Sequence, residues 1–329
     1  MWKNRIVGQE YAVELFEHVF QNDKLAQSYL FYGPEGVGKR TFATSLAKAI
    51  FCKNGYGVGC GNCPPCLKVE HQAHADFLMI QPLDGKQSIS IDQVRQLPAI
   101  LYRKPQEGQK RIVVIDSLDE MEVIAQNALL KLLEEPPQDN VLILLACQIQ
   151  QILPTIQSRC QPVRFRPLTT KEVATILSRQ FPEKRYPEAA IVLARGSVSE
   201  ALNIADDQKL MTLYLEAIEW FFQEEVWEAR DRTEWISQQE KANWSRDEFI
   251  LFWEIWQGLY RDRLIIAAGG QGRLLQHQNL EGRYRTMQKL SASEMIRRLY
   301  EIDQGLLRLK KRGNGPMVTE AILVKWRRE

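Results

Sequence analysis

The sequence predicts an α/β fold over roughly the first half of the chain and an all-α fold over the rest. Short apolar runs alternate with helical patterns over about the first 165 residues, which is typical of a parallel α/β sheet. A glycine-rich loop stands between one of these runs and a helical pattern. Strand signals end after about residue 207, and seven of the eight tryptophans lie beyond that point.

Composition places the chain among ordinary globular proteins. Of its 329 residues, 45% are hydrophobic and 26% are charged, and this length predicts two or three domains. The net charge of +2 provides no overall field that would draw the chain onto DNA, so nucleic-acid contacts must be local or shared with partners. No run reaches the roughly 18 apolar residues of a membrane span, and no signal peptide is recognisable at the start. We expect a cytoplasmic protein.

The α/β part contains five predicted strands, at residues 28–32, 77–80, 111–115, 141–146 and 162–166. Helical patterns lie between them, for example over 41–51 and 121–133, and the second must end before Pro136 because proline cannot continue a helix. Short helices are predicted from about 167 to 206. Thr169 or Thr170, with Glu172 close behind, is expected to cap the first of them.

Aromatic and aliphatic residues recur at helical spacing in the last third of the chain, over 210–221 and 249–260. They have two interpretations. One is a stacking platform for single-stranded nucleic acid. The other, which the helical spacing favours, is the core of a helical domain. The glycine-rich residues 269–272 are expected to form a loop between helices.

Residues 33–41 (GPEGVGKRT) lie between a predicted strand and a predicted helix. In this setting backbone N–H groups and the helix dipole point at one spot, as in phosphate-binding loops. Gly33, Gly36 and Gly38 would let the backbone approach a phosphate closely. Lys39 would bridge the β- and γ-phosphates of a nucleotide. The pattern predicts a P-loop that binds ATP or ADP, or a vestige of one.

Several positions depart from what hydrolysis requires. Arg40 stands where Ser or Thr would hold Mg²⁺, and Thr41 comes one place late. Asp116 follows a predicted strand as the expected Mg²⁺-side carboxylate, but Ser117 stands where a glutamate would activate water, and serine is a poor base. The carboxylates at 119 and 120 are expected to be turned away. The constellation is suited at most to nucleotide binding.

Four cysteines crowd into fifteen residues between the P-loop helix and the next strand: Cys52, Cys60, Cys63 and Cys66. Four thiolates can close a tetrahedral, structural Zn²⁺ site, and the intervening glycines let a short segment wrap an ion. An iron–sulfur cluster is an alternative, although the fourth Cys-Pro of the ferredoxin pattern is absent. Free buried thiols are another.

The remaining candidate thiols and imidazoles have simpler interpretations. Cys147 and Cys160 are expected to be small buried residues. His71 and His74 follow the cysteines and would be alternative metal ligands, but with four thiols present we expect ordinary surface or helix-cap histidines.

Several stretches together resemble the AAA+ clamp-loader family, most closely its delta-prime branch in the bacterial DNA polymerase III clamp loader. They are residues 6–9 (IVGQ), the P-loop, the cysteine module, residues 125–137 (AQNALLKLLEEPP) and residues 153–160 (LPTIQSRC). The resemblance covers residues 1–206 well and the rest only in length and helical character. It implies a RecA-like AAA+ domain over 1–166 with the Cys₄ zinc module at 52–66, a helical lid over 167–206, and a helical collar over 207–329.

The resemblance also implies a role for Arg159. In clamp loaders this arginine meets the γ-phosphate in the site of a neighbouring subunit, where a planar, permanently charged guanidinium suits phosphate oxygens. A solvated surface arginine is the alternative on spacing alone. Gln148 stands where active relatives sense the γ-phosphate, and Glu200 replaces an arginine that faces the phosphates. A carboxylate there would repel a triphosphate.

These features imply a non-motor subunit, a stator that donates Arg159 to an adjacent ATPase subunit and has no intrinsic ATPase activity. The implied partners are ATPase motor subunits and the clamp-opening delta subunit, with the sliding clamp and primed DNA reached through the complex and no membrane involved. The chain would then belong to the DNA polymerase III holoenzyme, a DNA-directed DNA polymerase and nucleotidyltransferase.

Two alternatives remain. One is an active ATPase motor subunit of the same loader, a DNA-dependent ATPase, against which Arg40, Ser117 and Glu200 argue. The other is an independent zinc-dependent nucleic-acid-binding module, which the near-neutral charge disfavours. The basic residues from Arg308 to Arg312 are interpreted as a solvated helix end rather than a DNA site.

Overall fold

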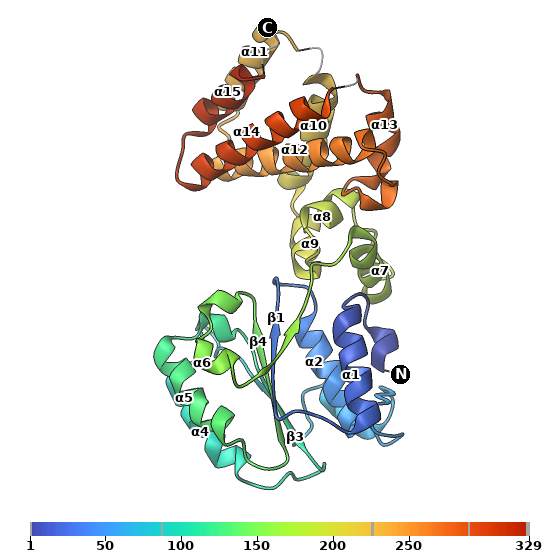
Figure 1. The fold of residues 1–329 in the computed structure, drawn as a ribbon, viewed down its shortest axis with the longest axis vertical. Coiled ribbons are helices and arrows are strands. Elements are labelled where there is room, and N and C mark those ends of the chain that lie inside the picture. Colours follow the sequence, from blue (N-terminus) through green and yellow to red (C-terminus); the bar gives the residue numbers. More distant parts are fainter. Residues whose placement is uncertain (1, 87, 225–226, 289, 327–329) are drawn as a thin grey trace. The chain divides into compact units, whose positions relative to one another are not determined.

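The structure, a computed structural model, describes residues 2–86, 88–224, 227–288 and 290–326. It contains two compact units (Figure 1). Unit 1 comprises Met1–Arg185 and Arg195–Glu200, and unit 2 comprises Tyr186–Ala194 and Ala201–Glu329. Among the described residues no helix is both long and apolar enough to cross a membrane. The predicted three-domain division, with boundaries after residues 166 and 206, remains a prediction.

Unit 1 is built on a five-stranded parallel sheet with the order β2-β3-β4-β1-β5. The strands are β1 (Ser28–Tyr32), β2 (Phe77–Ile80), β3 (Arg111–Ile115), β4 (Asn140–Ala146) and β5 (Gln161–Arg164). All five predicted strands are confirmed. The last ends two residues earlier than predicted because it pairs only with β1, whose own ladder ends where Tyr32 meets Arg164.

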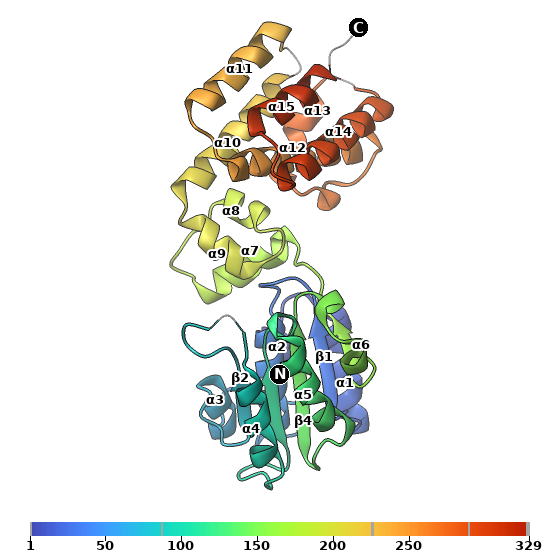
Figure 2. The ribbon, with the colours of Figure 1, turned by 90° about the vertical axis from the view of Figure 1, so that its left-hand side faces the viewer.

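Helices cover both faces of this sheet (Figures 1 and 2). Alternation along the buried strands sends Tyr29 and Phe31 to one face and Leu30 to the other. The first face packs against the 3₁₀ turn η1 (Trp2–Arg5), α1 (Glu10–Asn22) and α2 (Lys39–Phe51), with α3 (Pro64–Glu70) beside α2. The second packs against α4 (Ile91–Leu101), α5 (Val123–Glu134) and α6 (Pro154–Gln157).

Shorter elements complete unit 1. They are η2 (Leu118–Glu120), η3 (Ile149–Gln151) and α7 (Thr170–Gln180). The predicted cap of α7 is confirmed: the Thr169 hydroxyl accepts from the N–H of Glu172, whose carboxylate accepts from the N–H of Thr169. The helix α9 (Val198–Ala205) begins in unit 1 and continues in unit 2.

The described residues of unit 2 form helices joined by loops and contain no strand, as predicted. Its helices are α8 (Glu188–Leu193), α10 (Gln208–Gln223), α11 (Ala229–Lys241), α12 (Arg246–Ala267), α13 (Glu281–Thr286), α14 (Ala292–Lys310) and α15 (Gly315–Val324), with η5 (Gly272–Leu274) and η6 (Gln278–Leu280) before α13.

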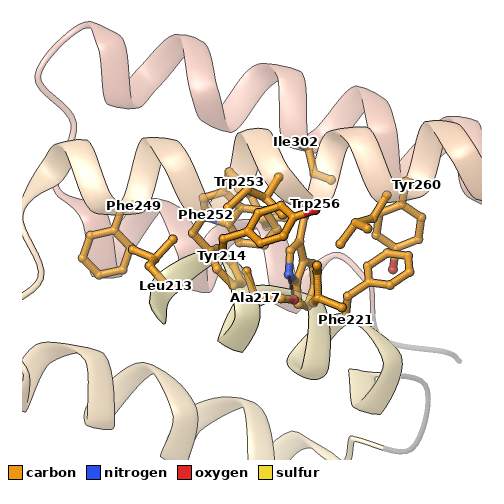
Figure 3. Packing of buried hydrophobic residues seen from close by; sticks show 14 of the residues in the cluster. Leu213, Tyr214, Ala217, Phe221, Phe249, Phe252, Trp253, Trp256, Tyr260 and Ile302 are labelled. Atoms are coloured by element: carbon orange, nitrogen blue, oxygen red, sulfur yellow. Dashed lines mark hydrogen bonds between the residues drawn. The ribbon is translucent and has the colours of Figure 1, made fainter. Parts of the chain in front are cut away.

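The aromatic residues of unit 2 form its core (Figure 3). Trp253 and Trp256 on α12 are fully buried, and the Trp256 indole N–H donates to the Ala217 carbonyl at 2.9 Å. The Trp253 N–H donates to the Thr319 hydroxyl at 3.0 Å. These rings are therefore core residues and not a platform for stacking bases.

Candidate nucleotide and metal sites

The phosphate loop runs from the carboxyl end of β1 to the first turn of α2, as the sequence predicts. Gly33 has φ of 150°, and a Cβ there would lie 2.1 Å from the Phe165 carbonyl oxygen, so only glycine fits beside β5. Gly38 is the N-cap of α2 with φ of 95°. The loop, the helix N-terminus and Lys39 are thus placed as in a P-loop.

The ammonium group of Lys39 is turned back onto its own loop. Its Nζ donates to the carbonyl oxygens of Gly33 at 2.6 Å and Pro34 at 2.7 Å, and lies 3.4 Å from the Cys147 sulfur. The side chain is only 7% exposed. Binding of a β- or γ-phosphate by this lysine would require these bonds to exchange.

Arg40 pairs directly with Asp116. Its Nε donates to the Asp116 Oδ2 at 2.7 Å, and one Nη group pairs with the same oxygen. The Asp116 Oδ1 accepts from the N–H of Ser117 at 2.9 Å. A guanidinium therefore stands beside the carboxylate that was expected to serve Mg²⁺, while Thr41 is exposed on α2.

The start of α9 lies over the phosphate loop within unit 1. The N–H of Val198 donates to the Gly36 carbonyl at 2.9 Å. The hydroxyls of Ser197 and Ser199 crowd Gly36, where a Cβ would approach them to 2.0 and 2.3 Å. Glu200 belongs to this segment but is exposed, and its N–H donates to the Ser197 hydroxyl. At Gly36 the phosphate loop therefore contacts a backbone N–H group and two neutral hydroxyl groups.

The end of β4 is tied down by a carboxylate. Asp119 accepts from the N–H groups of Cys147 at 3.0 Å and Gln148 at 2.8 Å. Since the Cys147 sulfur contacts Lys39, these bonds do not separate Asp119 from the phosphate loop, and its turning away from the site stays a prediction. The Gln148 amide oxygen accepts from the Gln151 side chain. Glu120 is exposed. The pKa of its carboxyl group is raised, first because that group loses part of its contact with water and then because the Asp119 carboxylate lies nearby.

Arg159 lies just after α6 with its guanidinium held by three groups. One Nη donates to the Glu134 carboxylate at 2.7 Å. The other donates to the Thr155 carbonyl at 2.9 Å and approaches the Ser158 hydroxyl at 3.4 Å. The side chain remains 34% exposed, and Glu134 is 49% exposed. The arginine is oriented by these bonds yet accessible from solvent.

The four predicted cysteines come together. The sulfur atoms of Cys52, Cys60, Cys63 and Cys66 all lie within 4.8 Å of one another. Sulfur atoms about 2.3 Å from a central Zn²⁺ would stand roughly 3.8 Å apart in a tetrahedron, so the four thiols fit such an ion. Four sulfur ligands would fill a tetrahedral shell and leave no position for water, the arrangement that structural metal sites have.

The surroundings of these thiols suit a metal site. N–H groups of Asn62 and Cys63 lower the pKa of Cys60 to about 6, which favours the thiolate that binds metal. Burial raises the pKa of Cys66 to about 12 in the metal-free chain. His74 is not a ligand: its Nδ1 accepts from the N–H of Asp76, and its ring stacks on Phe51 at 4.1 Å.

Three participants were not predicted from the sequence. Cys147 is the sulfur beside Lys39, and Glu134 is the carboxylate that orients Arg159. Arg40 was noted as a missing Mg²⁺ ligand but not as the ion-pair partner of Asp116. Only Glu134 had a signal, because it lies in the same distinctive run of residues, 125–137, that carries the family resemblance.

Fold and loop together define the class: an α/β protein with a parallel sheet and a phosphate loop after β1, whose lysine is bonded to the carbonyl groups of its own loop. A family described as "DNA polymerase III, delta subunit" matches residues 8–169. The DNA polymerase III subunit delta' of Bacillus subtilis is 30% identical over 288 residues, which cover 83% of this chain and 82% of that protein. That of Pseudomonas aeruginosa is 40% identical over 136 residues, 41% of this chain and 42% of its own length.

Other relatives carry a different subunit name. The DNA polymerase III subunit tau of Escherichia coli is 32% identical over 209 residues, which span 61% of this chain but only 32% of that protein. Because the Bacillus relationship extends over most of both chains, this chain belongs to the family of DNA polymerase III delta-prime subunits. The resemblance to that branch is confirmed.

Proposed function

We propose that this chain is a non-motor subunit of the replicative DNA polymerase III clamp loader. It would act as a stator that donates Arg159 to an adjacent ATPase subunit while the loader places a sliding clamp on primed DNA. Its partners would be ATPase motor subunits and the clamp-opening delta subunit. Residues 207–329 would supply the collar that joins the ring, and the lid would span 167–206.

The observation that carries this proposal is the ion pair between Arg40 and Asp116. A divalent cation and a guanidinium compete for one carboxylate, so Mg²⁺ would have to displace Arg40. Lys39 is engaged with loop carbonyls at the same time. Ser117 then offers no base for water. Hydrolysis needs all of these parts together. Here the lysine and the carboxylate are engaged by other groups of the chain, and the base is missing.

Arg159 supports the donor half of the proposal. A finger must be exposed enough to reach another subunit and held well enough to avoid a large entropic loss on docking. The side chain meets both conditions, since Glu134 and Thr155 fix two edges of the fork and a third of it stays accessible. An active motor subunit remains the rival function; the same loop chemistry argues against it.

Turnover by the isolated chain tests the proposal directly. We expect the purified chain to hydrolyse ATP with Mg²⁺ no faster than background. Ser117→Glu alone should not restore hydrolysis, because Arg40 and Glu200 would still oppose Mg²⁺ and triphosphate and such sites act as units. Steady-state phosphate release is the measurement. Robust turnover by the wild-type chain, or clear rescue by the single change, would favour the motor function instead.

Zinc is the proposed ion for the four thiols. We expect metal analysis to find about one zinc per chain, and Cys60→Ser or Cys63→Ser to lose it. Cys160→Ser, outside the cluster, is the matched control and should retain the metal. Loss of the ion should unfold the local glycine-rich segment and leave the phosphate loop intact, because closed structural sites stabilise the fold around them. A brown, iron-containing preparation or four freely titrating thiols would overturn the zinc assignment.

A further inference from the structure

A cavity of about 940 Å³ lies beside the cysteine module. Its walls come from the ends of α1 and α2, from the module with the start of α3, from His74, and from residues 107–110. These segments adjoin the amino ends of β2 and β3. The phosphate loop and Asp116 instead follow the carboxyl ends of their strands, so the cavity has no part in the nucleotide chemistry.

One wall of the cavity is fixed by a buried carboxylate. Asp76 is fully buried and accepts from the N–H groups of Gln106 at 2.8 Å, Glu107 at 2.7 Å and Gly108 at 2.9 Å. The buried Arg111 lies 3.4 Å from the same carboxylate. The loop before β3 is therefore preformed, which reduces the entropic loss when a ligand binds.

The cysteine module forms the facing wall. Cys52, Pro64 and Pro65 line the cavity, and Lys68 on α3 reaches across to the Glu107 carboxylate at 2.6 Å. A metal ion on the four thiols would hold this wall in place. Shaping the cavity would give the module a purpose beyond local stability.

The cavity presents more positive than negative charge. Lys53 and Lys110 line it and make no ion pair with any residue that the structure describes, whereas Lys68 and Glu107 neutralise each other. Asp23 is the remaining carboxylate in the lining. His74 accepts at Nδ1, which leaves its Nε2 as the proton-bearing donor.

The lining favours carboxylates over phosphates. Among its described residues there is no arginine, the fork that suits phosphate best, and the N–H groups of 106–108 are already bonded to Asp76. Apolar surface from Tyr56, Pro64 and Pro65 adjoins the lysines. We propose that this cavity binds an acidic, partly apolar peptide segment of a partner protein.

Fluorescence anisotropy with the zinc-loaded full chain tests this proposal. The probe is a short fluorescein-labelled peptide that repeats Asp-Glu-Leu-Pro, and its neutral match repeats Asn-Gln-Leu-Pro. We expect the acidic peptide to bind and the neutral one to bind at least about tenfold more weakly. Lys53→Glu combined with Lys110→Glu should weaken the acidic peptide by at least about tenfold. The control pair Lys131→Glu and Lys171→Glu, exposed lysines outside the cavity, should not.

Several outcomes would contradict the proposal. The proposal would be overturned if wild type bound both peptides equally, or if it bound neither at millimolar concentration. It would also be overturned if the reversed variant, Lys53→Glu with Lys110→Glu, bound the acidic peptide as tightly as wild type does. Tighter binding of oligo(dT) than of the peptide, lost in the same variant, would assign the cavity to single-stranded nucleic acid instead. If the reversed variant fails to fold, Lys53→Gln with Lys110→Gln should give a smaller loss in the same direction. None of these results depends on Arg159 or on ATP hydrolysis.

Discussion

Arg159→Ala should leave this chain folded and able to join the assembled loader, while ATP hydrolysis stimulated by clamp and primed DNA falls. An arginine supplied in trans stabilises charge on the transferring phosphoryl group and contributes about 10³–10⁵ in rate at the site that it serves. The loss in the whole complex should be partial, because other subunits would supply their own arginines. Clamp loading should fall with hydrolysis.

Two further variants separate chemistry from charge. Arg159→Lys should rescue little, since an ammonium cannot reproduce a planar fork. Arg164→Ala is the matched control: it removes an exposed arginine of the same unit that makes no ion pair among the described residues, and it should change nothing. Assembly must be measured alongside hydrolysis. Wild-type turnover in a properly assembled Arg159→Ala complex would remove this residue from catalysis, and failed assembly would make it a structural interface residue.

Asp76→Asn should lower the free energy of unfolding by about 3–5 kcal/mol, the usual effect of breaking a buried ion pair. The change keeps the shape of the side chain but leaves Arg111 buried without a counter-charge. The carboxylate also holds the loop before β3 through three N–H donors. Chemical denaturation of the full chain measures the effect. Asp92→Asn, at an exposed and loosely paired site, should stay within about 0.5 kcal/mol of wild type.

The same carboxylate makes stability depend on pH. Burial alone would raise the pKa of Asp76, but the three N–H groups and Arg111 outweigh it and hold that pKa below its ordinary value. A depressed folded-state pKa stabilises the protein above the unfolded value of about 3.9, and the contribution is lost as pH falls through the folded value. Wild type should therefore lose stability below about pH 4, and Asp76→Asn should lack that component. Parallel pH profiles would contradict this role.

Much of unit 1 could be predicted because its signals are local. Strands such as Arg111–Ile115 are fully buried in a parallel sheet and so appear as unbroken apolar runs. The phosphate loop has its own glycine spacing, and the Cys₄ set lies within fifteen residues. The helical core of unit 2 followed from the spacing of its aromatic residues.

Contacts between distant segments could not be predicted in this way. Arg40 and Asp116 are 76 residues apart in the sequence. They meet because β1 and β3 are parallel, so that the loop after β1 and the residue after β3 lie at the same edge of the sheet. The sequence identified Lys39 as the lysine of the phosphate loop. Whether its ammonium group faces solvent or its own loop depends on the folded backbone. The cavity beside the cysteines is built from several separate segments, and of these the cysteine module alone carried a motif in the sequence.

The most direct test of the stator function is the number of ATP molecules hydrolysed in the first turnover of the assembled loader. Rapid-quench measurement of burst amplitude counts competent sites without depending on later steps. We expect the wild-type burst to equal the number of ATPase partner subunits, with no contribution from this chain, and Arg159→Ala to lower it by one ATP per complex. A burst that includes one ATP for this chain, or one that Arg159→Ala leaves unchanged, would contradict the proposed function.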